Sequence, residues 1–218
     1  MNSSATSGLY SDVLDFAHTT PSWFQSLAEL WTEAGLLLFG ALFVMVWWQA
    51  RPSGSRAVAV AVLAPLGTAF AYVCSELSKS VIQEDRPCRT VTGSVSLIPC
   101  PPVGDWSFPS NHATIAGAAA IALVVARPVL AYLTVPMALL MAFSRVFVGV
   151  HYPHDVAVGL VVGGVVAPLF ILLAARPLQR LVETMRSSNS GAVLWLAGPG
   201  PGEAEPVVAR GRHSAGRN

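Results

Sequence analysis

The chain has 218 residues, of which 53% are hydrophobic and 11% are charged, and its formal net charge is +1. Soluble domains carry about 25% charged residues. This deficit, together with a mean hydropathy of +0.56, indicates a membrane protein. The arginines are scattered without a basic stripe, which argues against nucleic-acid binding. The chain also does not begin with a basic start and a continuous apolar run, so we expect no cleavable signal peptide.

Residues 1–33 form the first predicted segment. Apolar and acidic residues alternate in it, and Pro21 divides it into two short pieces. Such a segment is too polar to cross a bilayer. It is typical of an amphipathic helix that lies in the membrane interface, with Trp23 and Trp31 at the level of the headgroups. The alternative is a cap that covers a pocket from the soluble side.

Five apolar stretches follow, and a helix of about 20 residues crosses a hydrocarbon core of about 30 Å. They are residues 34–50, 57–75, 111–126, 129–150 and 155–175. The sequence therefore predicts an all-α fold, a polytopic membrane bundle of about five transmembrane helices over residues 34–186, preceded by the interfacial helix. From residue 187 onward Ser, Gly, Pro and Arg predominate, so residues 187–218 are expected to be a disordered cytoplasmic tail.

The distribution of arginines predicts the orientation. Basic residues in short loops mark the cytoplasmic side, and with five spans one side receives Arg51, Arg56, Arg127, Arg176, Arg180 and Arg186. The loop 80–108 and the segment 145–155 fall on the opposite side, which we expect to face outside. Cys88 and Cys100 both lie in this outer loop, where an oxidising environment permits a disulfide. Two free thiols are the alternative.

Three polar segments lie on the expected outer side, although each has an ordinary explanation when taken alone. Their candidate residues are Lys79 and Arg86, then Ser110, Asn111 and His112, and finally Arg145, His151 and Asp155. A serine before a helix is usually an N-cap, and an arginine at a membrane boundary usually reaches for the headgroups. Their joint occurrence favours a functional site, since ionisable groups near hydrocarbon are rare and usually used.

The combination suits phosphoryl transfer. If Asp155 holds one nitrogen of His151, the other nitrogen is free to attack phosphorus, and His112 would protonate the leaving oxygen. The cations would neutralise the phosphoryl oxygens. The helix that begins at Ser110 and Asn111 would offer free backbone amides to the same anion.

These motifs resemble the three signature motifs of the type 2 phosphatidic acid phosphatase superfamily, which comprises membrane lipid phosphatases and vanadium-dependent haloperoxidases. The matching stretches are Lys79-x6-Arg86-Pro87, Pro109-Ser-Asn-His112 and Ser144-Arg145-x5-His151-x3-Asp155. The resemblance covers about residues 34–175. It implies phosphoryl transfer without a metal or other cofactor, through a phosphohistidine on His151. Asn111 stands where the family usually has Gly, and its side chain is expected to narrow the pocket or to add a hydrogen bond.

Within that superfamily the layout is most similar to the bacterial undecaprenyl-diphosphatases linked to bacitracin resistance. The similarity implies a polyprenyl diphosphate substrate in the outer leaflet of a cell membrane, with the site facing outside and the C-terminus in the cytoplasm. Phosphatidic acid and phosphatidylglycerol phosphate are alternative substrates. The sequence leaves the oligomeric state open.

Two other functions are considered. A metal hydrolase would take its ligands from His151, His154, Asp155, Glu84 or Asp85, but this set is a poor version of a converging site. His154 is expected to point away from Asp155, because neighbours on a helix differ by about 100°. The last alternative is a lipid transporter or a lipid-binding protein. The two histidines, His112 and His151, argue against it, since binding alone needs no nucleophile.

Overall fold

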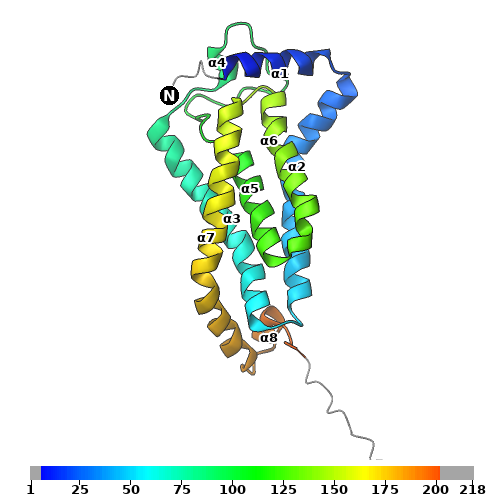
Figure 1. The fold of residues 1–218 in the computed structure, drawn as a ribbon, viewed down its shortest axis with the longest axis vertical. Coiled ribbons are helices and arrows are strands. Elements are labelled where there is room, and N and C mark those ends of the chain that lie inside the picture. Colours follow the sequence, from blue (N-terminus) through cyan, green and yellow to red (C-terminus); the bar gives the residue numbers. More distant parts are fainter. Residues whose placement is uncertain (1–5, 202–218) are drawn as a thin grey trace, which may run out of the picture.

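The computed structural model describes residues 6–201, which form a bundle of helices (Figure 1). The helices are α1 (Ser7–Thr19), α2 (Ser22–Ala50), α3 (Ser55–Ile82), α4 (Pro87–Thr90), α5 (Asn111–Ala126), the 3-10 turn η2 (Pro128–Leu130), α6 (Ala131–Phe147), α7 (Pro153–Arg186) and α8 (Gly191–Ala197). The described residues contain no strand. Within residues 6–201, four segments are long and apolar enough to cross a membrane, namely α2, α3 with α4, η2 with α6, and α7, and α5 is a shorter apolar helix. The prediction of an all-α membrane bundle is confirmed.

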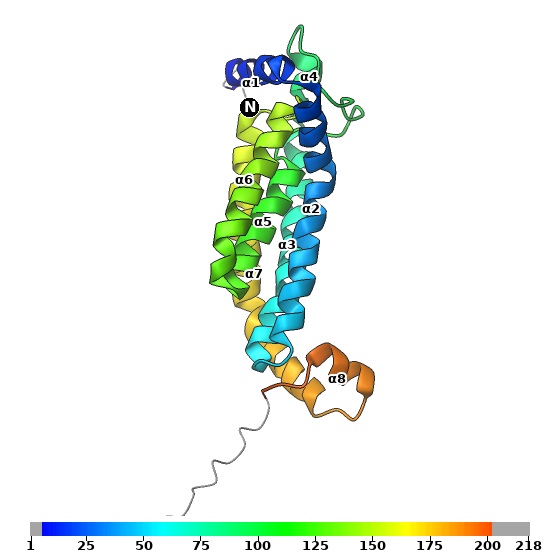
Figure 2. The ribbon, with the colours of Figure 1, turned by 90° about the vertical axis from the view of Figure 1, so that its right-hand side faces the viewer.

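Helix α5 lies at the centre of the bundle and packs against α2, α3, α6 and α7 (Figures 1 and 2). It coincides with the predicted third span, and of its 16 residues nine are buried, all but one of which are alanine, glycine or threonine. A helix that is apolar on all sides is typical of complete burial. Small side chains let its neighbours approach closely, as in other membrane bundles.

Helices α5 and α7 approach each other closely at two glycines of α7. A Cβ added to Gly159 would lie 2.7 Å from the carbonyl oxygen of Ser110, and one added to Gly163 would overlap the carbonyl oxygen of Thr114. The two backbones therefore touch. This contact places the start of α5 beside the first turn of α7, where the Ser110 amide donates to the carbonyl oxygen of Asp155 at 3.1 Å.

Helix α1 lies across the end of the bundle that also carries α4 (Figures 1 and 2). Tyr10 and Leu14 are buried beneath it, and the Tyr10 hydroxyl donates to the Gly149 carbonyl at 3.0 Å. Helix α1 thus covers this end as a cap. Leu9 and Phe16 remain exposed, so the same helix keeps an apolar edge for the membrane interface.

The first span begins earlier than predicted. The chain breaks at Pro21 as expected, but α2 then runs without interruption from Ser22 rather than from residue 34. Its 29 residues extend about 44 Å at 1.5 Å per residue, which exceeds a hydrocarbon core of about 30 Å. The turns that contain Glu29 and Glu33 can therefore lie outside the core, so acidic residues there do not require a separate segment.

The segment that follows α7 differs from the expected disordered tail, because residues 191–197 form α8. The Trp195 ring lies 5.2 Å from that of Trp47, and the Arg51 guanidinium lies 5.1 Å from the Trp195 ring. Arg186 donates to the Ala197 carbonyl at 3.1 Å. These contacts hold the segment against the opposite end of the bundle, and composition alone did not reveal them. The rest of the predicted tail, residues 202–218, lies outside the described residues.

Cys88 and Cys100 form a disulfide within the loop between α3 and α5, with their Cα atoms 6.1 Å apart. Cys74 is free. The disulfide is the first of the two alternatives that the sequence left open, and it fastens the loop that carries part of the site described below.

The close approach of α5 and α7 predicts that Gly163→Ala destabilises the protein by about 1–3 kcal/mol, the usual cost of overpacking. The added methyl group meets backbone, which cannot move aside as a side chain can. The matched control is Gly40→Ala, because a Cβ there meets nothing within 4 Å. Thermal unfolding of the detergent-solubilised variants provides the measurement, and equal melting temperatures for the two would contradict the packing.

Candidate active site

The structure brings all eight predicted site residues to the end of the bundle that α1 and α4 cover (Figure 1). Lys79 lies in the last turn of α3 and Arg86 at the start of α4. Ser110, Asn111 and His112 begin α5, Arg145 lies near the end of α6, His151 lies in the loop between α6 and α7, and Asp155 lies in the first turn of α7. The three sequence motifs therefore meet in space.

Asp155 holds His151 at the centre of this group. Its Oδ2 atom accepts from His151 Nδ1 at 3.2 Å and from the Tyr152 amide at 2.8 Å. The Ser107 hydroxyl donates to the same oxygen. Asp155 is fully buried and His151 is 2% exposed. The imidazole ring is thus fixed by a carboxylate that is itself fixed by two other donors.

Arg86 reveals which nitrogen of His151 carries the proton. Its Nη1 atom lies 3.0 Å from His151 Nε2. A guanidinium has only donors, so Nε2 must accept this hydrogen bond with its lone pair. The proton of the neutral ring then sits on Nδ1 and points to Asp155. This is the tautomer that a nucleophilic histidine needs, with Nε2 turned toward the cations.

Burial lowers the pKa of His151 well below its ordinary value of 6.5, and the positive charges of Arg86, Arg145 and Lys79, together with the neighbouring His112, lower it further. The imidazole is therefore neutral at neutral pH. The same interactions show that residues from all three motifs act electrostatically on one ring.

Asp105, which the sequence analysis did not single out, lies between two of the cations. Its Oδ1 atom is 2.9 Å from Arg86 Nη2 and 3.5 Å from Lys79 Nζ. Burial alone raises the pKa of Asp105, but the hydrogen bond and charge of Arg86, together with Lys79, lower it overall. An anionic oxygen thus lies where the two cations converge, and a phosphate oxygen would suit the same position.

Among the eight predicted site residues, Ser110 Oγ and Arg145 Nε are buried donors that have no acceptor within the described part of the chain. Ser110 is the N-cap residue of α5, but its hydroxyl makes no capping hydrogen bond. The Nη1 atom of Arg145 donates to Thr32 Oγ1 at 2.7 Å, which leaves Nε unused. An unsatisfied buried donor costs about 1–3 kcal/mol, so both atoms fit a ligand that brings acceptor oxygens.

The Asn111 side chain is turned toward α3. Its Oδ1 atom accepts from the Ser75 hydroxyl at 2.8 Å, and its Nδ2 atom donates to Glu76. Glu76 in turn lies 3.5 Å from Lys79 Nζ. Asn111 therefore adds hydrogen bonds, which is the second of its two expected effects, and through Glu76 on α3 it helps to place a cation of the site.

The sequence reasoning missed Thr32, Asp105 and Ser107, which lie on α2 and in the loop before α5. No local pattern marks them, since they reach the site through long-range contacts. The expectation for His154 is wrong, because its Nε2 atom lies 3.3 Å from Asp155 Oδ1. The Asp155 side chain turns back along the first turn of α7, so the two groups meet despite their helical offset.

The site combines a buried imidazole–carboxylate pair with a cluster of cations at one end of a membrane bundle. This combination is typical of membrane proteins that bind an anionic group. The PAP2 superfamily matches residues 60–177, which include all three motifs, and the chain belongs to this superfamily.

Two curated relatives carry the name undecaprenyl-diphosphatase. One, from Sulfolobus acidocaldarius, is 32% identical over 120 residues, which cover 54% of this chain and 57% of that protein. The other, BcrC of Bacillus subtilis, is 29% identical over 74% of this chain and 81% of its own length. Among solved structures, a phosphatidylglycerolphosphate phosphatase of the PAP2 type from Bacillus subtilis has a TM-score of 0.57 at 20% identity, over 83% of this chain and 88% of that one. This last likeness shows the shared fold.

The lowered pKa of His151 predicts how stability depends on pH. Since the unfolded chain binds a proton near pH 6.5 and the folded site does not, stability should fall as the pH drops below 6.5, by up to about 1.4 kcal/mol per pH unit for this group. His151→Gln should remove this part of the loss, whereas His18→Gln, on the exposed side of α1, should not. Melting temperatures between pH 7.5 and 5 measure it, and parallel curves for wild type and His151→Gln would refute the assignment.

Proposed function

We propose that the chain is an integral-membrane lipid phosphatase that removes the terminal phosphate of a polyprenyl diphosphate, such as undecaprenyl diphosphate, through a phosphohistidine on His151. The observation that carries this proposal is the tautomer of His151. Its Nδ1–H group binds Asp155, and the lone pair of Nε2 points toward the cations. A non-catalytic lipid binder or transporter has no use for an oriented nucleophile.

The reaction follows in two displacements. His151 Nε2 attacks the terminal phosphorus as the bond to the lipid-phosphate oxygen breaks, and His112 gives that oxygen a proton. Water then attacks the phosphohistidine, the N–P bond breaks, His112 accepts a proton from the water, and inorganic phosphate leaves. Asp155 stabilises the positive charge that develops on the imidazole in the first step.

The phosphate-binding role falls to the cations and to the unsatisfied donors. Lys79, Arg86 and Arg145 would stabilise charge on the phosphoryl oxygens in the transition state. The hydroxyl of Ser110 and the backbone amide of Asn111 would add hydrogen bonds at the start of α5. Arrival of the phosphate would replace the Asp105 carboxylate as the partner of Lys79 and Arg86, and it would free Nε2 of His151 from Arg86.

An apolar groove beside the site supports a lipid substrate. It has a volume of about 290 Å³ and lies between α2 and α6, lined mainly by aromatic and leucine side chains such as Trp31, Leu140, Phe143 and Phe147. Trp31 adjoins Thr32, which binds Arg145. A hydrocarbon chain in this groove would leave its headgroup beside the cations. The isoprenyl chain is favoured over an acyl chain by the named relatives, of which two are undecaprenyl-diphosphatases.

The proposed orientation places the site outside and the C-terminus in the cytoplasm. Arg51 and Arg186 lie at the α8 end, away from the site, which agrees with the cytoplasmic bias of basic residues. The disulfide of Cys88 and Cys100 lies at the site end, as an oxidising compartment would permit.

The assigned role of Asp155 predicts that Asp155→Asn lowers kcat by on the order of 10⁴-fold, the loss seen when the orienting carboxylate of a Ser-His-Asp site is amidated. An amide can donate to Nδ1 and so favours the wrong tautomer. The matched control is Asp85→Asn, since Asp85 is an exposed acid of the neighbouring loop. Phosphate release under saturating substrate is measured, and near-normal turnover of Asp155→Asn would show that the pairing is not catalytic.

The proposed substrate is tested by phosphate release from polyprenyl diphosphate, phosphatidic acid and phosphatidylglycerol phosphate with purified protein. We expect the highest kcat/KM for the polyprenyl diphosphate, full activity after chelation and inhibition by orthovanadate. A higher kcat/KM for either glycerolipid would contradict the proposed substrate and would identify that glycerolipid as the preferred one. Lipid binding without phosphate release would favour the binder, and hydrolysis abolished by a chelator would favour the metal hydrolase.

A further inference from the structure

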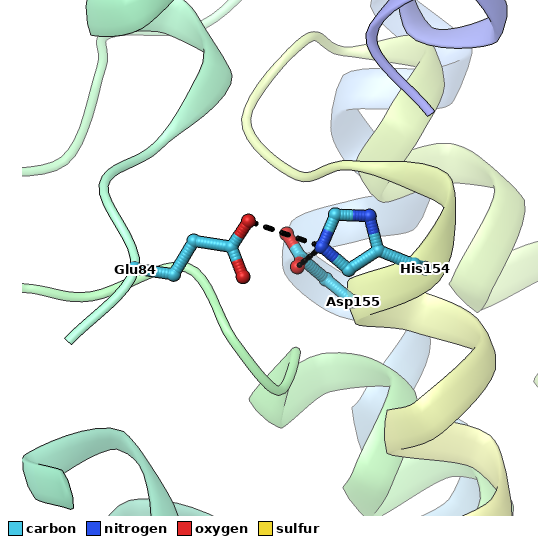
Figure 3. A group of neighbouring side chains, drawn as sticks. All are labelled: Glu84, His154 and Asp155. Atoms are coloured by element: carbon cyan, nitrogen blue, oxygen red, sulfur yellow. Dashed lines mark hydrogen bonds and ion pairs between the residues drawn. The ribbon is translucent and has the colours of Figure 1, made fainter. Parts of the chain in front are cut away.

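A second polar cluster lies next to the site and shares Asp155 with it, while its other two residues, Glu84 and His154, have no part in the proposed reaction. Figure 3 shows Glu84, from the loop between α3 and α4, facing His154 and Asp155 at the start of α7. One ligand atom from each of the three residues lies within 4.8 Å of the other two. The cluster therefore joins two elements that are far apart in the sequence.

The carboxylate oxygens of Glu84 and Asp155 lack enough hydrogen-bond donors. His154 Nε2 lies 3.1 Å from Glu84 Oε1 and 3.3 Å from Asp155 Oδ1. A ring nitrogen carries at most one hydrogen, and only the contact to Glu84 has hydrogen-bond geometry. Within the described part of the chain, Asp155 Oδ1 and Glu84 Oε2 are buried without any hydrogen-bond donor.

Both carboxylates are more than nine-tenths buried, Asp155 with 0% and Glu84 with 8% of its surface exposed. Buried carboxylates without donors are costly and need a positive partner. A cation placed between the three ligand atoms would supply one for both acids at once, which the single hydrogen of His154 cannot do.

The geometry suits a small divalent cation. Tetrahedral ligands at about 2.0–2.1 Å from the metal are themselves about 3.3 Å apart, close to the two separations found here. The other ring nitrogen of His154, Nδ1, lies 2.6 Å from the Thr6 hydroxyl. Such a partner on the distal nitrogen typically fixes a metal-binding histidine. One imidazole with two carboxylates favours Zn²⁺ or Mn²⁺ over Ca²⁺ or Mg²⁺, which prefer oxygen ligands alone.

We propose that Glu84, His154 and Asp155 bind a divalent transition metal that fastens the loop between α3 and α4 to the start of α7. Asp155 bridges the two sites, since Oδ2 holds His151 while Oδ1 faces the metal. The metal lies on the far side of this carboxylate from the nucleophile and takes no part in the attack on phosphorus. The inference does not rest on the proposed function, and it replaces the expectation that this region holds no metal.

The test is metal binding by the full chain, purified in detergent with a tag that contains no histidine and stripped with a chelator. Zn²⁺ and Mn²⁺ are titrated by calorimetry, and bound metal is counted by mass spectrometry after dialysis. We expect one equivalent with saturable binding, at least a tenfold weaker affinity in both Glu84→Gln and His154→Ala, and a melting temperature that rises with metal in the wild type but in neither of these two variants. The substitution Glu84→Gln keeps the shape of the side chain, so it tests the charge without removing the packing.

Two matched controls separate this site from ordinary surface binding. Asp85→Asn removes the exposed acid next to Glu84, and His18→Ala removes a histidine of the same end of the bundle. Both should bind metal as the wild type does. Absence of saturable binding in the wild type overturns the proposal and leaves only the hydrogen bond between His154 and Glu84 in this cluster. Wild-type affinity in Glu84→Gln and His154→Ala overturns it as well, because the metal would then lie elsewhere.

Discussion

The structure of the site depends on one carboxylate, that of Asp155. Its Oδ2 atom receives hydrogen bonds from the Tyr152 amide, the Ser107 hydroxyl and His151 Nδ1. Hydrogen bonds to a charged group are worth about 1.5–3 kcal/mol each, so this oxygen ties the start of α7 to the loop before α5 and to the imidazole. The same hydrogen bond determines which ring nitrogen of His151 is available, since a ring held at Nδ1 can present only Nε2 to a substrate.

The packing of the bundle explains why this carboxylate lies where it does. Gly159 and Gly163 let α7 touch the backbone of α5, and this contact brings the N-terminus of α5 against the first turn of α7. Ser110 is thereby buried with a free hydroxyl, and its amide binds the Asp155 carbonyl. Lys79 and Arg86 arrive from a third direction, at the end of α3 and the start of α4. The packing of these helices thus gathers the candidate site residues at one end of the bundle, and the free energy of helix packing supports the preorganisation of the site.

Much of this arrangement could be predicted because it is local. The four-residue spacing of His151 and Asp155 places them around the entry of a helix, where a proline at the first position and an acid in the first turn are favoured. The central span was predicted with correct bounds because Arg127-Pro128 ends it and Ser110 begins it. Helix α2 was placed too short because its first turns carry acids, which hydropathy counts as loop although a long helix can extend beyond the hydrocarbon.

What escaped prediction depends on contacts between distant parts of the chain. Asp105 and Ser107 lie in an irregular loop, and nothing in their sequence neighbourhood shows that Asp105 contacts two cations and that Ser107 contacts the carboxylate of Asp155. Helix α8 owes its position to Trp47 and Arg51 on another helix. His154 was predicted to point away from Asp155 because the helical offset of neighbouring residues fixes the directions of their Cβ atoms. It does not fix how the Asp155 side chain turns back toward the His154 ring.

The stereochemical course at phosphorus tests the central claim most directly, with a lipid diphosphate whose terminal phosphorus is made chiral by oxygen isotopes and sulfur. Attack by His151 followed by attack of water predicts net retention of configuration, whereas inversion would mean a single displacement by water and would contradict the phosphohistidine.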